Sequence, residues 1–246
     1  MRRVSVPAVV QPALKQVGRL AAEQGVHAYA VGGCVRDWLL ELPPTTDLDI
    51  AVEGSGAGLA RAAAEALGGT AEAHPQFGTA TLRLPPGHGS IRRVDFAMCR
   101  KETYARPAAY PRVTPGTVAD DLFRRDFTIN AMAADLAAER FGTLLDPCGG
   151  RRDLARRVLR ILHARSFLDD PSRLLRGVRF LARFGLRWDA GTARAAREAV
   201  AAGALGWLNA GRLRKEFDAM LREPDPPACL QALAGLLEPA ARRGKR

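Results

Sequence analysis

The sequence predicts an α+β fold in which strands dominate the N-terminal part of the chain and helices alone follow. Three patterns support this prediction. Short apolar runs at residues 29–31 and 47–52 have the length of buried strands, with a Gly-Gly turn and a short helix between them. Residues 79–84 and 91–96 flank a Pro-Pro-Gly turn and alternate as the strands of a hairpin do. Beyond residue 151, apolar residues recur at helical spacing.

The composition indicates a globular chain with a polyanionic partner. With 246 residues the chain forms one large or two small domains, and its 47% hydrophobic content is sufficient for a core. The net charge of +11 favours nucleic acid as the partner. Nearly all of the positive charge is arginine, which suits bidentate phosphate contacts, although a GC-rich genome would produce the same excess.

The sequence also argues against several classes of protein. The four cysteines contain no C-x-x-C pair, which disfavours a zinc site or a disulfide framework. No apolar run is long enough to span a membrane, and no G-x-x-x-x-G-K-[ST] phosphate loop occurs. We therefore expect a cytoplasmic protein with no membrane partner.

The first elements predict a site for a phosphate chain. A helix over residues 8–25 precedes the first strand. Gly32 and Gly33 then end that strand and leave backbone N–H groups unobstructed. A helix that begins near Cys34 adds its own N–H groups and the positive end of its dipole, and Arg36 can bind the same anion with its guanidinium group. The alternative is that Gly-Gly is only a turn.

Asp47 and Asp49 are candidate metal ligands. They lie two apart on the next predicted strand, so both carboxylates leave from the same face. Their mutual repulsion favours a divalent cation between them, and hard oxygen ligands suit Mg²⁺. An isolated Asp-x-Asp is most often a solvated loop. Beside a phosphate site, however, the pair is what phosphoryl or nucleotidyl transfer requires.

These two motifs resemble those of a known family. Residues 32–37 (GGCVRD), followed by Asp47-Leu48-Asp49, are similar to the class II tRNA nucleotidyltransferases and bacterial poly(A) polymerases, within the DNA polymerase β superfamily. That family includes CCA-adding enzymes. Three further segments resemble its motifs in the expected order, at residues 120–133 (DDLFRRDFTINAMA), 145–154 (LDPCGGRRDL) and 169–180 (DDPSRLLRGVRF).

Asp95 is a candidate third carboxylate. It lies between Val94 and Phe96 on the second hairpin strand, and a carboxylate in an apolar strand is costly unless it is paired. Its partner is either the metal or a neighbouring arginine, and the sequence does not distinguish these.

Residues 99–120 are polar and rich in proline, and we expect a long loop there. The resemblance implies that this is a flexible loop involved in switching from C to A addition, which favours an enzyme able to add A. In the motif that follows, Arg125 can supply charge to a triphosphate. Asp126 and Asn130 are expected one helical turn apart, where they could brace one another.

Positive charge is concentrated in residues 151–187, which contain eleven arginines and three aspartates. A helix is expected to begin at Asp170-Pro171, with Asp170 as its cap. Five arginines would then share one face of this helix, a row of like charges that is unfavourable unless an anion occupies it. They are Arg173, Arg176, Arg179, Arg183 and Arg187. The alternative is a solvated face.

The resemblance implies specific roles for this helix. Asp170 and Arg173 would read the incoming base, because a carboxylate accepts from the exocyclic amine of C or A and a carbonyl in U or G would leave it unpaired. Asp169 stands where many members have Glu. The triphosphate would be held by Gly33, Arg36, Arg125, Arg176 and Arg179, with Gly32 in the same turn, and Mg²⁺ by Asp47 and Asp49.

The expected organisation is a nucleotidyltransferase head with a mixed sheet and flanking helices at residues 1–145, a helical neck at 146–206 and the start of a truncated helical body at 207–246. The expected activity is addition of C, A or both to the tRNA 3′ end from CTP and ATP. A poly(A) polymerase of the same fold, or a non-catalytic RNA- or nucleotide-binding module, remains as an alternative.

Overall fold

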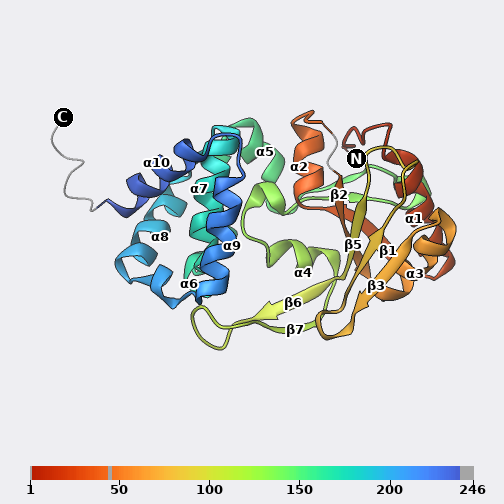
Figure 1. Ribbon diagram of the computed structural model, residues 1–246, viewed down its shortest axis with the longest axis horizontal. Coiled ribbons are helices and arrows are strands. Elements are labelled where there is room, and N and C mark those ends of the chain that lie inside the picture. The colour runs from red at the N-terminus through yellow and green to blue at the C-terminus, as the bar shows by residue number, and fades with distance from the viewer. Residues whose placement is uncertain (1, 44–45, 239–246) are drawn as a thin grey trace. The chain divides into compact units, whose positions relative to one another are not determined.

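The computed structural model describes residues 2–43 and 46–238 (Figure 1). The chain divides into two compact units. The sheet unit contains residues 1–102, 113–125 and 129–151, and the helical unit contains residues 103–112, 126–128 and 152–246. The basic tail at residues 242–246 and the last residues of the helix expected at 228–241 lie outside the described part. The three-part division at residues 145 and 206 stays a prediction.

A seven-stranded mixed sheet forms the centre of the sheet unit, in the order β3-β4-β5-β2-β1-β8-β9. Among the described strands of this sheet β2 and β5 pair in parallel and the other neighbours are antiparallel, so the predicted mixed sheet and the antiparallel β4–β5 hairpin are both confirmed. The strands are β1 (His27–Val31), β2 (Asp47–Glu53), β3 (Thr70–His74), β4 (Thr79–Arg83), β5 (Arg93–Met98), β8 (Ala133–Asp135) and β9 (Leu144–Leu145).

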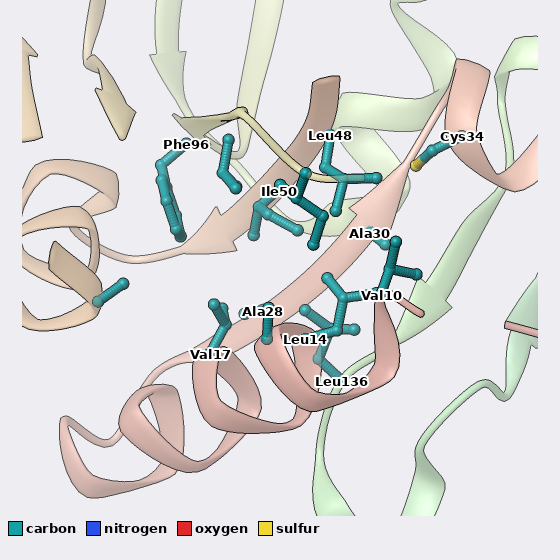
Figure 2. Packing of buried hydrophobic residues seen from close by; sticks show 14 of the residues in the cluster. Val10, Leu14, Val17, Ala28, Ala30, Cys34, Leu48, Ile50, Phe96 and Leu136 are labelled. Atoms are coloured by element: carbon teal, nitrogen blue, oxygen red, sulfur yellow. The ribbon is translucent and has the colours of Figure 1, made fainter. Parts of the chain in front are cut away.

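Helices α1 (Gln11–Glu23) and α3 (Gly56–Leu67) cover one face of this sheet and bury the apolar core against it. Figure 2 shows Val10, Leu14 and Val17 lying against Ala28 and Ala30 of β1. These side chains share one face of α1 because they recur at helical spacing. The other face of the sheet carries polar side chains such as Thr81 and Asp95 beside the buried Tyr29 and Ala51.

Two shorter helices complete the sheet unit. Helix α2 (Gly33–Leu39) follows β1 directly. Helix α4 (Val118–Phe123) packs near β2 and begins with a capping box between Thr117 and Asp120. The Glu53 carboxylate at the end of β2 also accepts from the Val118 N–H at 2.6 Å, which fixes the start of α4.

The segment predicted to be a long loop contains two strands, β6 (Arg100–Thr103) and β7 (Arg112–Pro115), which form a separate two-stranded sheet. The prediction of a helix that carries both Asp126 and Asn130 is also wrong. Phe127 forms an isolated bridge, and a single 3₁₀ turn, η2 (Thr128–Asn130), follows it. The sheet unit also contains the 3₁₀ turns η1 (Pro75–Phe77) and η3 (Ala138–Arg140).

The helical unit is built around α7 (Ser172–Phe184), which packs against α9 and α10. Its aromatic core joins Phe127, Phe167, Phe180 and Trp188. The remaining elements are β10 (Val158–Leu159), α6 (Ser166–Asp169), β11 (Arg187–Trp188), α8 (Ala190–Ala201), η4 (Ala204–Trp207), α9 (Ala210–Leu221) and α10 (Pro226–Leu237), while α5 (Gly150–Ala155) spans the boundary between the units. No helix in the part of the chain described here is long and apolar enough to cross a membrane.

Candidate active site

The acidic face of the sheet lies on β2 and β5. Asp47 and Asp49 are exposed on one face of β2, whereas Leu48 and Ile50 between and after them are buried on the other. The strand register places Asp49 opposite Asp95 and Asp47 opposite Arg93. The sequence-based prediction that the two aspartates leave from the same face is therefore confirmed, and Asp95 joins them from the neighbouring strand.

Asp95 is bound by its protein neighbours. Its Oδ1 accepts from the Thr81 hydroxyl at 2.7 Å and from Arg93 Nε at 3.0 Å, and its Oδ2 lies 2.9 Å from a terminal nitrogen of Arg93. The ion-pair alternative is thus confirmed, and a metal-binding role for Asp95 remains a proposal. Among the residues described, no group of three or more His, Cys, Asp or Glu side chains is arranged to hold a metal.

Asp49 is placed where its negative charge is disfavoured. Desolvation by the surrounding protein raises its pKa, and the charges of Asp95 and Asp47 raise it further, whereas Arg125 and Arg93 oppose the shift. Burial also raises the pKa of the neighbouring Cys34 thiol to about 12, so this cysteine is protonated and inert at neutral pH. A cation beside Asp49 would relieve the repulsion between the carboxylates.

The Gly-Gly turn lies against two guanidinium groups. Gly32 has φ +75°, and a Cβ at this position would come within 2.5 Å of Arg125 Nη1. A Cβ on Gly33 would lie 3.4 Å from Arg36 Nη2. The Gly32 N–H donates to the Met132 carbonyl, so this N–H is already used within the protein. The structure therefore brings all four predicted residues of this cradle together, with Gly32 required for the conformation of the turn.

The orientation of Arg125 is set by Asp121, a residue to which the sequence analysis assigned no role. The Asp121 side chain is only 1% exposed. Its Oδ2 accepts from Arg125 at 2.8 Å and its Oδ1 from Arg124 at 2.6 Å. Burial alone would raise the pKa of Asp121, but the guanidinium groups of Arg125 and Arg124 together lower it. Nη1 of Arg125 makes no hydrogen bond to any described residue and points to Gly32.

Arg36, in contrast, is buried and bonded on several sides. It donates to the Asp37 carboxylate at 2.8 Å and to the Asn130 side-chain oxygen at 2.6 Å. These bonds join α2 to the 3₁₀ turn that contains Asn130. Arg36 thus lies beside the Gly-Gly turn and holds this part of the site together, whereas its role in binding an anion stays a prediction.

In the helical unit, the predicted N-cap is wrong by one residue, because α7 begins at Ser172 with Pro171 as its N-cap and Asp170 lies just before it. The Oδ1 of Asp170 accepts from the Ser172 N–H at 3.0 Å and from the Ser172 hydroxyl at 2.6 Å, and it also accepts from Arg212 of α9. Arg173 is buried and donates to the Ser166 hydroxyl at 2.7 Å. Arg212 and Ser166 were not found from the sequence, because both lie outside the motif.

The prediction that five arginines without carboxylate partners line one face of α7 is wrong. The helix ends at Gly185, which adopts a left-handed conformation, so Arg187 belongs to β11. Arg176 forms an ion pair with Asp126 at 2.6 Å. Arg179 contacts Glu216 at 3.0 Å and Glu223 at 3.1 Å. Carboxylates distant in sequence therefore compensate these charges, and an external anion is not required to stabilise the row.

The sequence profile described as "Poly A polymerase head domain" matches residues 28–160, more than half of the chain. The chain belongs to this family. The match spans β1, the acidic strand β2 and Arg125, so it contains every candidate site residue of the sheet unit.

Two curated relatives are tRNA nucleotidyltransferases. The chain is 40% identical over 225 residues to the A-adding tRNA nucleotidyltransferase of Halalkalibacterium halodurans, which covers 91% of this chain and 52% of that protein. It is 42% identical over 205 residues to the CC-adding tRNA nucleotidyltransferase of Deinococcus radiodurans, over 83% of this chain and 52% of the relative. The chain thus spans about half the length of these relatives, and about a quarter of an A-adding relative in Aquifex aeolicus.

Solved structures agree with the fold. A CCA-adding enzyme in an apo form superposes with a TM-score of 0.87 at 37% identity, over 96% of this chain and 57% of the other. A tRNA nucleotidyltransferase complexed with a primer tRNA and an incoming ATP analogue gives a TM-score of 0.78 at 39% identity, over 89% and 60% of the two chains. The predicted family and fold class are therefore confirmed.

Proposed function

We propose that this chain carries the catalytic part of a template-independent RNA nucleotidyltransferase that adds C, A or both to the tRNA 3′ end. One observation carries the proposal. Arg125, which lies against the Gly-Gly turn, is close enough to Asp49 to lower its pKa. A phosphate chain bound at Arg125 would therefore lie beside the Asp47–Asp49 pair. The names of the curated relatives support the same activity.

The residues present fit a divalent metal. Asp47 and Asp49 offer hard oxygen ligands on one face of β2. Desolvation and the nearby carboxylates raise the pKa of Asp49 although Arg125 and Arg93 oppose the shift, so a further cation would be favourable there. We propose that they hold Mg²⁺. When bound, the metal would polarise the phosphates and neutralise charge that develops on them. Asp95 could take part only by giving up contacts with Arg93 and Thr81.

The remaining residues bind and orient the nucleotide in this proposal. Nη1 of Arg125 and the Gly33 backbone would contact the triphosphate, with Arg36 as a brace beneath them. Arg176 and Arg179 would each exchange a carboxylate partner for a phosphate. The tRNA 3′ hydroxyl attacks the α-phosphate in line, an oxygen–phosphorus bond forms, and pyrophosphate leaves as the bond between the α- and β-phosphates breaks.

Base selection falls to Asp170 and Arg173. The carboxylate would accept from the exocyclic amine of C or A, and the guanidinium would donate to a ring acceptor.

The RNA itself would be held in part by charge. Within the described helical unit, four arginines around α5 and β11 form no ion pair, namely Arg152, Arg156, Arg157 and Arg187. With tRNA as substrate, we place the enzyme in the cytoplasm.

The test is incorporation of labelled CTP and ATP, each alone, with Mg²⁺ present. The acceptors are a tRNA transcript that lacks the CCA tail, one that ends after its second C, and an unrelated RNA. Asp49→Ala should abolish incorporation and leave RNA binding intact. Asp218→Ala is the matched control, because Asp218 is an exposed aspartate of α9 that forms a loose ion pair with Arg214 at 3.8 Å.

The outcomes separate the alternatives. A single A added after the second C would indicate an A-adding enzyme, and two C residues followed by arrest would indicate a CC-adding one. Runs of A on the unrelated RNA would favour a poly(A) polymerase. RNA binding without any incorporation would favour a binding module. Incorporation that survives Asp49→Ala would contradict the metal assignment.

A further inference from the structure

We propose that Arg212 of α9 is a specificity-positioning residue, which fixes the carboxylate of Asp170 so that a single oxygen remains to read the base. This inference rests on the proposed function of Asp170. It goes further by assigning a role to a residue of another helix, outside the motif that carries the base-reading pair.

The hydrogen bonds of Asp170 are strongly one-sided. Three donors converge on Oδ1: the Ser172 N–H at 3.0 Å, the Ser172 hydroxyl at 2.6 Å, and the Arg212 guanidinium. Oδ2 accepts no hydrogen bond from any residue in the described part of the chain. A carboxylate oxygen offers about two lone-pair directions, so three donors saturate Oδ1. Oδ2 is left as the acceptor for one exocyclic amine.

This arrangement also fixes the plane of the carboxylate. The terminal torsion of Asp is broad, so an unrestrained carboxylate could rotate and tilt its free oxygen away from the base. Rotation here would break three hydrogen bonds at once. Ser172 supplies two of these donors, and Arg212 adds a charged donor from a second helix. A fixed acceptor discriminates more strongly, because a carbonyl placed opposite it cannot be accommodated by rotation.

The position of Arg212 is itself well defined. Its backbone N–H donates to the side-chain oxygen of Asn209, the N-cap of α9, at 2.9 Å. The side chains of Arg212 and Asp170 are 26% and 23% exposed. Partly exposed ion pairs contribute little to stability. Replacement of Arg212 should therefore change nucleotide selection without unfolding the protein, which makes the proposal separable from a structural role.

The experiment compares Arg212→Gln with Arg214→Gln. Arg214 lies on the same helix, its side chain is 84% exposed, and it pairs loosely with Asp218 at 3.8 Å, so it controls for loss of one positive charge from α9. Thermal-shift titrations with CTP, ATP, UTP and GTP, each alone, measure affinity without tRNA. Incorporation on tRNA transcripts then measures the ratio of correct nucleotide to UTP.

We expect Arg212→Gln to weaken binding of the preferred nucleotide about tenfold and to lower discrimination against UTP by a similar factor, the loss of one charge-assisted hydrogen bond. Arg214→Gln should behave as wild type, and Arg212→Lys should recover part of the discrimination. Unchanged discrimination in Arg212→Gln, or an equal loss for all four nucleotides, would overturn the inference. Failure of the wild type to bind any of the four would instead overturn the proposed function.

Discussion

Replacement of Gly32 by alanine tests whether the Gly-Gly turn and Arg125 form one site. Gly32 has φ +75° and ψ −125°, a region that residues with a Cβ rarely occupy, so the strain alone should cost about 1–3 kcal/mol. For a chain of this size, that corresponds to a melting temperature lower by about 2–12 °C. The new Cβ would also lie 2.5 Å from Arg125 Nη1, and an ordinary contact begins at 3.4 Å.

Arg125 must therefore move by about 1 Å, a displacement that can reduce activity about a hundredfold when it misplaces a catalytic contact. The assay is Mg²⁺-dependent incorporation, with the melting temperature measured in parallel. Gly33→Ala is the matched control, because Gly33 has an ordinary helical conformation and its Cβ would meet only Arg36 Nη2 at 3.4 Å. We expect it to have a much smaller effect on both measurements.

A double-mutant cycle isolates the contact itself. In an Arg125→Ala background the displaced group is absent, so Gly32→Ala should cause little further loss of activity while its effect on stability persists. Equal and independent losses of activity in the two backgrounds would refute the reasoning. So would a Gly32→Ala protein with wild-type incorporation, because the turn and Arg125 would then not act together.

Three further predictions concern buried or crowded charges. Asp121→Asn removes the shared partner of two arginines and should lower the free energy of unfolding, measured with denaturant, by about 3–5 kcal/mol. Because the pKa of Asp121 is lowered in the folded protein, its ionised form stabilises the fold above pH 3.8 and this stabilisation is lost as the pH falls below that value. The variant should lack this acid dependence. Asp49→Asn should raise the melting temperature of the metal-free protein at neutral pH. The pKa of Asp49 is raised in the folded protein, so its ionisation above pH 3.8 disfavours folding. Mg²⁺ should stabilise the variant less than the wild type. Arg179→Met should destabilise the protein by about 3–5 kcal/mol, because it leaves the buried Glu216 without this partner. A second substitution, Glu216→Gln, should restore part of the lost stability. Unchanged stability in Arg179→Met would contradict the pairing.

The sheet and the acidic site could be predicted because local patterns determine them. Alternation along β4 and β5 reflects one face against the helices and one towards polar side chains, and the same alternation places Asp47 and Asp49 together. The Gly-Gly turn follows from conformations that only glycine adopts readily. Each of these inferences depends on neighbours within a few residues along the chain.

The ion pairs could not be predicted for the opposite reason. Arg176 and Asp126 are 50 residues apart in sequence, and Arg179 and Glu216 are 37 apart. No local pattern links such partners, since they meet only after α7 has packed against α9 and the segment at Phe127. The strands β6 and β7 were overlooked in a similar way, because their polar, proline-rich sequence resembles a loop.

The distribution of paired and unpaired arginines changes where an RNA chain should bind. A row of like charges on one helix predicts an anion only if nothing in the protein compensates it. On α7 the compensation is internal, so much of the positive charge there is balanced by carboxylates of the helical unit. The uncompensated charge of that unit includes the arginines at residues 152–157 and Arg187, where the Arg187 N–H donates to the Arg157 carbonyl at 2.9 Å. We therefore predict that salt weakens RNA binding in part through these residues, whereas Arg176 and Arg179 are already paired with carboxylates of their own unit.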